Sequence, residues 1–207
     1  MTISARSIIL ACLFASYSLP AFADDVVGMW SSTLREPGGL GSQLTFAQNG
    51  DVIHTFGVLV DFKYEVDGSQ IKLMQLNPDH SPMDEVSNQE FSIKGDTLTL
   101  NPRSPDQRQI MMRVGKRYKG AHPIVGAWTY THQTGNPAVM KYSRDGTGLL
   151  SVPFRTLTGL YDVNQSKLSV TFQGKKTALS DFRLPDSDHL ILTNPEAKES
   201  GYLRFKY

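Results

Sequence analysis

Short stretches in which apolar and polar residues alternate recur along most of the chain. Ile71 and Leu73 fall on one face of such a stretch, and Leu98 and Leu100 do the same in another. Alternation with a period of two residues is typical of β-strands that bury one face. No stretch carries a sustained apolar stripe of helical period with capping residues. The pattern therefore predicts an all-β protein.

Turn-forming pairs separate these stretches. Asn49-Gly50, Asp67-Gly68 and Asp145-Gly146 tolerate the positive φ angles of tight hairpin turns, so consecutive strands are expected to run antiparallel. In the first half of the chain the pattern predicts eight strands, over residues 27–34, 43–47, 52–58, 62–66, 70–75, 89–93, 97–100 and 109–114.

The same pattern occurs twice. Val27-Gly28-Met29-Trp30 opens one run, and Val125-Gly126-Ala127-Trp128 opens a second. Residues 46–50 match residues 142–146 in the order of aromatic, polar and turn positions. A repeat of this kind indicates two copies of one folding unit.

The copies have clear boundaries in the sequence. We expect one unit over residues 26–115 and another over 123–207, joined by a linker over 116–122 that contains Gly120 and has no apolar pattern. A small antiparallel sheet has exposed edges unless it closes on itself. The sequence therefore predicts two tandem small eight-stranded antiparallel barrels.

The N-terminal segment has the features of an export signal. Arg6 precedes an apolar run over residues 8–14, and Ala21-Phe22-Ala23 has the small-residue pattern of a cleavage site. We expect residues 1–23 to be a signal peptide cleaved after Ala23, which makes the mature protein periplasmic or secreted. The run is too short to predict a membrane span, so none is expected in the mature chain. Lipoprotein processing at Cys12 is the alternative.

The charge balance argues against two classes of partner. The chain has 21 basic and 20 acidic residues, and Arg6 is the one charged residue in the predicted signal peptide, which leaves 20 of each sign. A neutral balance gives no electrostatic reason to expect a nucleic acid or an anionic membrane surface as partner. Cys12 is the one cysteine, so disulfides are not expected in the mature chain.

A glycine, one residue and then a tryptophan on the first strand, with an arginine on the last strand, resembles the signature of the lipocalin (calycin) superfamily. This resemblance implies that the tryptophan closes one end of a barrel and that the arginine lies across it. The two sets assigned to barrel closure are Gly28, Trp30 and Arg113, and Gly126, Trp128 and Arg204. A guanidinium over an indole ring also gains a cation–π contact.

Apolar residues exceed what one buried face needs around the third strand of each copy. One interpretation is a ligand pocket in a barrel mouth or in a groove between the barrels. The other is a strand fully buried where the two barrels pack together. The residues predicted to line the pocket are Phe56, Leu59, Phe62, Phe154, Leu157 and Leu160.

Motifs for catalysis or metal binding are absent from the sequence. The histidines, at positions 54, 80, 122, 132 and 189, have no metal-ligand spacing, and no Gly-x-Ser-x-Gly occurs. The sequence therefore predicts neither an enzyme nor a cofactor or metal site.

These observations predict an exported, non-enzymatic protein that binds a small apolar or amphipathic ligand. The alternative is a protein-binding module, either an envelope adaptor or similar to a protease inhibitor. Such a module would act through the loop tips at residues 35–41 and 79–85.

Overall fold

The computed structural model describes residues 23–77, 81–173 and 175–206. The described chain is all-β, as predicted, with one short helix, α1 (Ala23–Val26), and one 3-10 turn, η1 (Pro105–Gln107). The strands are β1 (Gly28–Ser32), β2 (Leu40–Phe46), β3 (Asp51–Asp67), β4 (Gln70–Leu76), β5 (Pro82–Lys94), β6 (Thr97–Leu100), β7 (Gln109–Val114), β8 (Gly126–Thr131), β9 (Pro137–Tyr142), β10 (Thr147–Asn164), β11 (Lys167–Phe172), β12 (Lys175–Arg183), β13 (His189–Thr193) and β14 (Glu199–Phe205).

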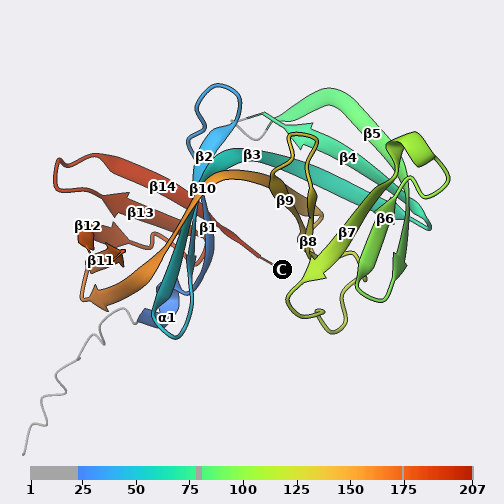
Figure 1. Cartoon of the computed structure of the whole chain (residues 1–207). Coiled ribbons are helices and arrows are strands. Elements are labelled where there is room, and N and C mark those ends of the chain that lie inside the picture. The colour runs from blue at the N-terminus through green and yellow to red at the C-terminus, as the bar shows by residue number, and fades with distance from the viewer. Residues whose placement is uncertain (1–22, 78–80, 174, 207) are drawn as a thin grey trace, which may run out of the picture.

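The 14 strands of the described residues form one closed antiparallel ring, in which β1 pairs with β14. Two long strands, β3 and β10, also pair with each other across the ring, from Lys63 opposite Thr147 to Asp51 opposite Leu160. This crossing pair divides the ring into two lobes (Figure 1). The first lobe contains β1, β2 and β11 to β14, and the second contains β4 to β9.

Each lobe takes strands from both copies of the repeat, which corrects the prediction of separate barrels over residues 26–115 and 123–207. β3 lies beside β2 in the first lobe through its N-terminal half and beside β4 in the second lobe through its C-terminal half. β10 crosses in the opposite direction, from β9 to β11. Because neither strand turns back at its middle, each carries the chain from one lobe into the other.

Two separate apolar cores fill the lobes. The core of the first lobe includes Trp30, Phe46 and Leu190, and that of the second lobe includes Trp128 and Leu98. All five side chains are fully or almost fully buried. The alternation seen in the sequence is confirmed, because Leu98 and Leu100 are both buried as expected for one inward face.

The two long strands approach closely where they cross. Gly57 lies opposite Pro153, and the register then shifts so that Phe56 faces Arg155, which leaves Phe154 as a β-bulge. A β-bulge bends a strand and increases its local twist. The bend accompanies the passage of β10 from one lobe into the other.

Several sequence predictions fall outside the described residues. Residues 1–22 hold nearly all of the predicted signal peptide, including Cys12, and residues 78–80 hold part of one predicted loop tip. Those predictions stay predictions. Within the described parts of the chain, no helix has the length and apolar character needed to cross a bilayer.

Candidate functional site

Both tryptophans are fully buried, and each lies under an arginine. The Arg204 guanidinium carbon is 4.2 Å from the Trp30 ring centroid, and the Arg113 guanidinium carbon is 4.0 Å from the Trp128 ring centroid. The expected type of contact is present, but the predicted sets, which placed Arg113 with Trp30 and Arg204 with Trp128, have the wrong partners. The reason is strand pairing: Arg204 lies opposite Trp30 between β14 and β1, and Arg113 lies opposite Trp128 between β7 and β8.

Hydrogen bonds also hold the two Trp–Arg pairs in place, one at an end of each lobe. The indole N–H of Trp30 donates to the Val26 carbonyl and that of Trp128 to the Ile124 carbonyl, both at 2.7 Å. Arg113 donates to the Val125 carbonyl at 3.0 Å. Buried polar groups that are satisfied in this way serve stability, so both ends are structural closures.

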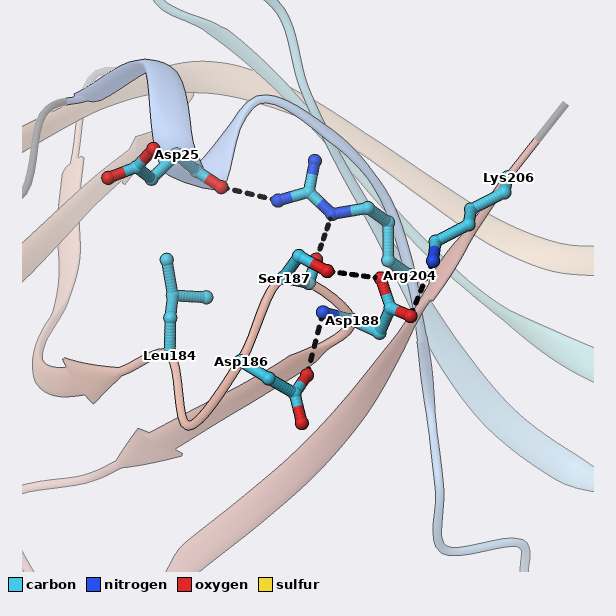
Figure 2. Close-up of a pocket in the computed structure, with 7 residues that line it drawn as sticks. All are labelled: Asp25, Leu184, Asp186, Ser187, Asp188, Arg204 and Lys206. Atoms are coloured by element: carbon cyan, nitrogen blue, oxygen red, sulfur yellow. Dashed lines mark hydrogen bonds and ion pairs between the residues drawn. The ribbon is translucent and has the colours of Figure 1, made fainter.

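A cavity of about 450 Å³ lies at the Arg204 end of the first lobe (Figure 2). Its lining residues are Asp25, Leu184, Asp186, Ser187, Asp188, Arg204 and Lys206. Their polar groups bind one another: Arg204 donates to the carbonyls of Asp25 and Ser187, and Lys206 forms an ion pair with Asp188 at 2.5 Å. The side-chain hydrogen bond from Lys206 lowers the pKa of Asp188. These polar groups bind one another, so they belong to the structure that closes this end of the first lobe.

A second cavity, of about 240 Å³, lies in the second lobe and is mainly apolar. We call it the apolar pocket; its lining residues are Val60, Phe62, Leu73, Gln75, Met83, Glu85, Ser87, Met140 and Leu150. They come from five strands, β3, β4, β5, β9 and β10. The pocket runs from Phe62, which is 5% exposed, to Met83, which is 37% exposed, so a buried wall and a solvent-facing rim belong to one space.

Phe62 is held from behind by neighbours in the core. Its ring meets the Tyr142 ring edge-to-face with centroids 5.6 Å apart. It also lies over Gly148, its partner across the β3–β10 pair, where a Cβ would come within 2.2 Å of the Phe62 ring. The absence of a side chain at Gly148 therefore makes room for the aromatic wall of the pocket.

A third cavity, of about 390 Å³, adjoins the apolar pocket. We call it the polar cavity after the Arg35–Asp61 ion pair in its wall, although most of its lining is apolar; its lining residues are Arg35, Gly38, Gly39, Leu59, Val60, Asp61, Gln75, Leu76, Asn77 and Met83. The two cavities share Val60, Gln75 and Met83. The Arg35 side chain is 5% exposed and forms an ion pair with Asp61 at 3.0 Å.

The structure brings together two of the six residues predicted to line a pocket. Phe62 lines the apolar pocket and Leu59 lines the polar cavity. Phe56, Phe154 and Leu160 are 43%, 57% and 60% exposed and line neither cavity.

Leu157 also lies away from both cavities, opposite His54 on the half of β10 that belongs to the first lobe. Burial lowers the pKa of His54, and its ring stacks on Phe172 with centroids 6.0 Å apart. The six predicted pocket residues do not share one cavity, because β3 and β10 each run through both lobes and so place the six residues in different parts of the molecule. A strand fully buried between the two units does not describe these residues either, because Phe56, Phe154 and Leu160 are exposed.

Sequence reasoning missed most of the residues that line the cavities. Met140 and Leu150 are inward positions of strands from the second copy that cover a pocket built mostly by the first copy. Arg35 and Met83 belong to the two predicted loop tips, and both line the polar cavity. The alternation of strand residues identifies inward positions, but no local signal shows which copy supplies the opposite wall.

A polar cluster is buried between the lobes. Lys141 on β9 is 7% exposed, and its ammonium lies 3.3 Å from the Gln43 side-chain oxygen and 2.6 Å from the Met29 sulfur. Gln43 in turn donates to Ser31 at 3.3 Å. Desolvation lowers the pKa of Lys141 to about 7.

No family model, curated protein or solved structure matches this chain. Within residues 23–77, 81–173 and 175–206, no group of three or more His, Cys, Asp or Glu residues is arranged to hold a metal ion. The functional argument therefore depends on the cavities of the second lobe.

Proposed function

We propose that this protein is a non-enzymatic binding protein that holds a small apolar or amphipathic molecule in the apolar pocket. The observation that carries the proposal is an enclosure by Phe62, Leu73, Met140 and Leu150 that reaches solvent at Met83. An apolar cavity of about 150 Å³ accepts benzene, so about 240 Å³ suits a molecule of roughly ten carbon atoms. Burial of apolar area would supply the affinity, at about 25 cal/mol per Å².

We propose further that each lobe is a lipocalin-like barrel built by exchange between the two copies. Counted with the shared strands β3 and β10, eight strands surround each core. Each lobe also has one tryptophan under one arginine, which supports the resemblance. A barrel of eight strands has room for one small ligand, in keeping with the size of the apolar pocket.

We also propose that residues 1–23 are a cleaved signal peptide and that the mature protein is periplasmic or secreted. Arg6, the apolar run over residues 8–14 and the Ala21-Phe22-Ala23 pattern support this proposal. N-terminal sequencing of the protein recovered from the periplasm or culture medium should begin at Asp24.

Methionine methyl groups give a direct test of ligand binding, because Met83 and Met140 both line the apolar pocket. In the chain 24–207 labelled with ¹³C at these methyls, titration with toluene should shift both signals saturably. Met29, which lies between the lobes against Lys141, should not respond. Unchanged Met83 and Met140 signals at saturating toluene would refute the proposal.

A pocket-filling variant provides the matched comparison. Leu73→Trp places an indole in the apolar pocket and should remove the response to toluene. Ile110→Trp puts the same side chain on β7 at an exposed position that lines neither cavity, and should leave the response intact. Equal toluene binding by both variants would place the site elsewhere.

A protein-binding module is a second candidate, favoured by one observation. Ile110, Met112 and Val114 point outward in a row along β7, and each is about half exposed. Contiguous exposed apolar side chains mark interaction surfaces in many proteins. A protein partner at this row would perturb the Met112 methyl signal and leave Met83 unchanged, which separates it from a ligand in the apolar pocket.

A further inference from the structure

We infer that the first half of β5 is a binding edge, which takes a short, basic, extended peptide segment of another protein as an additional strand. The inference is independent of the proposed function, because it rests on the backbone of β5 and not on the volume of the apolar pocket. It assigns an interaction surface and the kind of partner that fits it.

Residues 82–89 of β5, which we call the free edge, lie at the margin of the second lobe (Figure 1). β4 pairs with β5 along this stretch, as far as Leu76 opposite Pro82. β6 pairs with β5 only over residues 91–94. Among the described residues, no strand therefore lies beside the free edge on the side away from β4.

The outer backbone groups of the free edge lack partners. The Glu90 carbonyl accepts from the N–H of Asn101, which follows β6, at 2.6 Å, so the Glu90 backbone faces away from β4. Every second residue of a strand directs its backbone groups to the same side, and the register with β4 is unbroken from Glu90 to Val86. The N–H and C=O groups of Val86 and Asn88 therefore also point away from β4. No hydrogen bond joins them to another described residue.

The free edge is also open to solvent. A strand that packs one face on a core buries alternate residues, but residues 82–88 are exposed without a break. Met83 and Val86 contribute exposed apolar side chains to this stretch. An edge of this kind is a template for a further strand, which gains main-chain hydrogen bonds when it pairs.

The charge of the free edge determines which partner fits. Asp84 and Glu85 are both exposed, and neither forms an ion pair with another described residue. The next carboxylate along β5, that of Glu90, is already paired with Arg103 at 3.2 Å. Residues 82–89 contain no lysine or arginine. Because opposite charges across a strand pair are favourable, an added strand that carries lysine or arginine fits this edge.

The same charges disfavour a second copy of this chain as the partner. Two free edges paired with each other would bring together the Asp84 and Glu85 carboxylates of both copies, with no basic residue from either edge. Like charges across a strand pair are destabilising. Pro82 lacks a backbone donor, and the register with β4 is irregular before Val86, so the added strand is short.

Hydrogen exchange of single amides tests the free edge on the unaltered chain 24–207. The probe is the peptide acetyl-Thr-Val-Lys-Val-Arg-Thr-amide at low salt. At saturation the Val86 and Asn88 amides should exchange at least about ten-fold more slowly, because they gain acceptors. Ser87 and Gln89, whose backbones already face β4, should change little. Binding without this protection would show a contact between charges only and would overturn the added strand.

Two altered peptides separate backbone pairing from charge. With glutamate in place of lysine and arginine, the affinity measured by calorimetry at low salt should fall by about ten-fold or more, and added salt should reduce this difference. N-methylation of every backbone amide keeps the charges but removes the donors, and should abolish binding. An acidic or N-methylated peptide that binds as tightly as the basic peptide would count against the inference.

A proline on the free edge tests the backbone. The Asn88 N–H points outward, and edge strands accept proline at such a position, so Asn88→Pro removes one donor while the pairing with β4 remains. This variant should lose protection of Val86 by the peptide, whereas Asn88→Ala should keep it. Equal protection in the two variants would contradict pairing along this edge.

Removal of the two carboxylates tests the charge. Asp84→Asn/Glu85→Gln should lower the affinity for the basic peptide by about ten-fold at low salt. The matched control is Glu196→Gln/Glu199→Gln, which removes two exposed carboxylates of the first lobe and should leave the affinity unchanged. An equal loss in both variants would mean that the peptide responds to net charge and not to this edge.

The two proposals fail separately. If toluene shifts the Met83 and Met140 signals but the basic peptide does not bind, the proposed function stands and the binding edge is wrong. If the peptide protects Val86 and Asn88 but toluene does not bind, the opposite holds. Protection that rises with protein concentration in the absence of peptide would assign the edge to a second copy of the chain and overturn the basic partner. The peptide comparisons on the unaltered chain keep these distinctions even if a variant does not fold.

Discussion

Gly28 and Gly126 explain why the Gly-x-Trp pattern needs its glycine. Both have φ angles near +130°, in a region that side chains rarely adopt. A Cβ on Gly28 would lie 3.1 Å from the Arg204 guanidinium, and one on Gly126 would lie 2.7 Å from that of Arg113. The glycine therefore leaves room for the arginine that covers the tryptophan two residues later, and the three residues act as one structural unit.

Lys141 is a buried amine whose surroundings disfavour its charged form. It reaches from β9 to Met29 on β1 and Gln43 on β2, and among the described residues it has no acidic partner within ion-pair distance. Desolvation disfavours the ammonium form, which lowers the pKa of Lys141 from its ordinary value near 10.5 to about 7. Its repeat counterpart, in the matched segment 46–50 and 142–146, is Thr45, so this buried amine has no equivalent in the other copy.

Replacing Lys141 by Met should stabilise the protein and change its pH dependence. The lowered pKa means that the folded state binds fewer protons than the unfolded state between about pH 7 and pH 10, so the stability of the parent should rise over this window. The cost of the buried ammonium is fully present below about pH 7. Lys141→Met should therefore raise the free energy of unfolding by about 3–5 kcal/mol at pH 6 and by much less at pH 10.

Chemical denaturation at several pH values measures this effect. Lys63→Met, which changes an exposed lysine on β3, is the control and should leave the pH profile unchanged. A Lys141→Met variant that keeps the parent's rise in stability between pH 7 and pH 10 would contradict the assignment.

At the scale of elements, β3 and β10 decide the architecture. They cover 17 and 18 residues, against 13 in the next longest strand, β5, and among the described residues they are the pair that crosses the ring. The sequence pattern predicted two strands within the range of β3, over residues 52–58 and 62–66, and the structure joins them into one. The residues between them, Leu59, Val60 and Asp61, include no glycine or proline, and all three continue the strand.

Gly57 has no room for a side chain at the crossing. A Cβ there would lie 2.2 Å from the Val152 carbonyl oxygen and 2.8 Å from the Pro153 Cα, and backbone atoms cannot rotate away. Gly57→Ala should therefore destabilise the protein by about 1–3 kcal/mol or more, the usual range for overpacking. Thermal unfolding checks this, with Thr156→Ala, an exposed change on the partner strand, as the control; equal melting temperatures for the two variants would contradict the close approach.

At the scale of the whole molecule, the two copies exchange halves, and side-chain contacts follow the exchange. The Tyr64 hydroxyl donates to the Ser143 carbonyl at 2.5 Å, and the equivalent Tyr161 hydroxyl donates to the Ala47 carbonyl at 2.9 Å. Each tyrosine thus ties the hairpin of the other copy. Exchange of equivalent elements between two related units is the arrangement known from domain swapping, here within one chain.

Cutting the linker should therefore leave the protein assembled. A protease site inserted between Gly115 and Lys116 separates the copies covalently, while the β1–β14, β7–β8 and β3–β10 pairings still join them. The cleaved chain should elute as one species of the same size as the uncut protein, and the fragments should separate in denaturant. Two independently folded half-size monomers in native buffer would contradict the exchange.

The sequence by itself determined the all-β class, the antiparallel turns and the Trp–Arg type of closure. These depend on local alternation, on Asn-Gly and Asp-Gly turns, and on residue types that suit one another whichever copy supplies them. The tertiary structure alone decided the partners: Arg204 rather than Arg113 covers Trp30, and Met140 of the second copy faces Phe62 of the first. Two copies with the same pattern offer equivalent strand edges, so the local pattern cannot distinguish pairing within a copy from pairing between copies. The continuous course of β3 and β10 makes that choice.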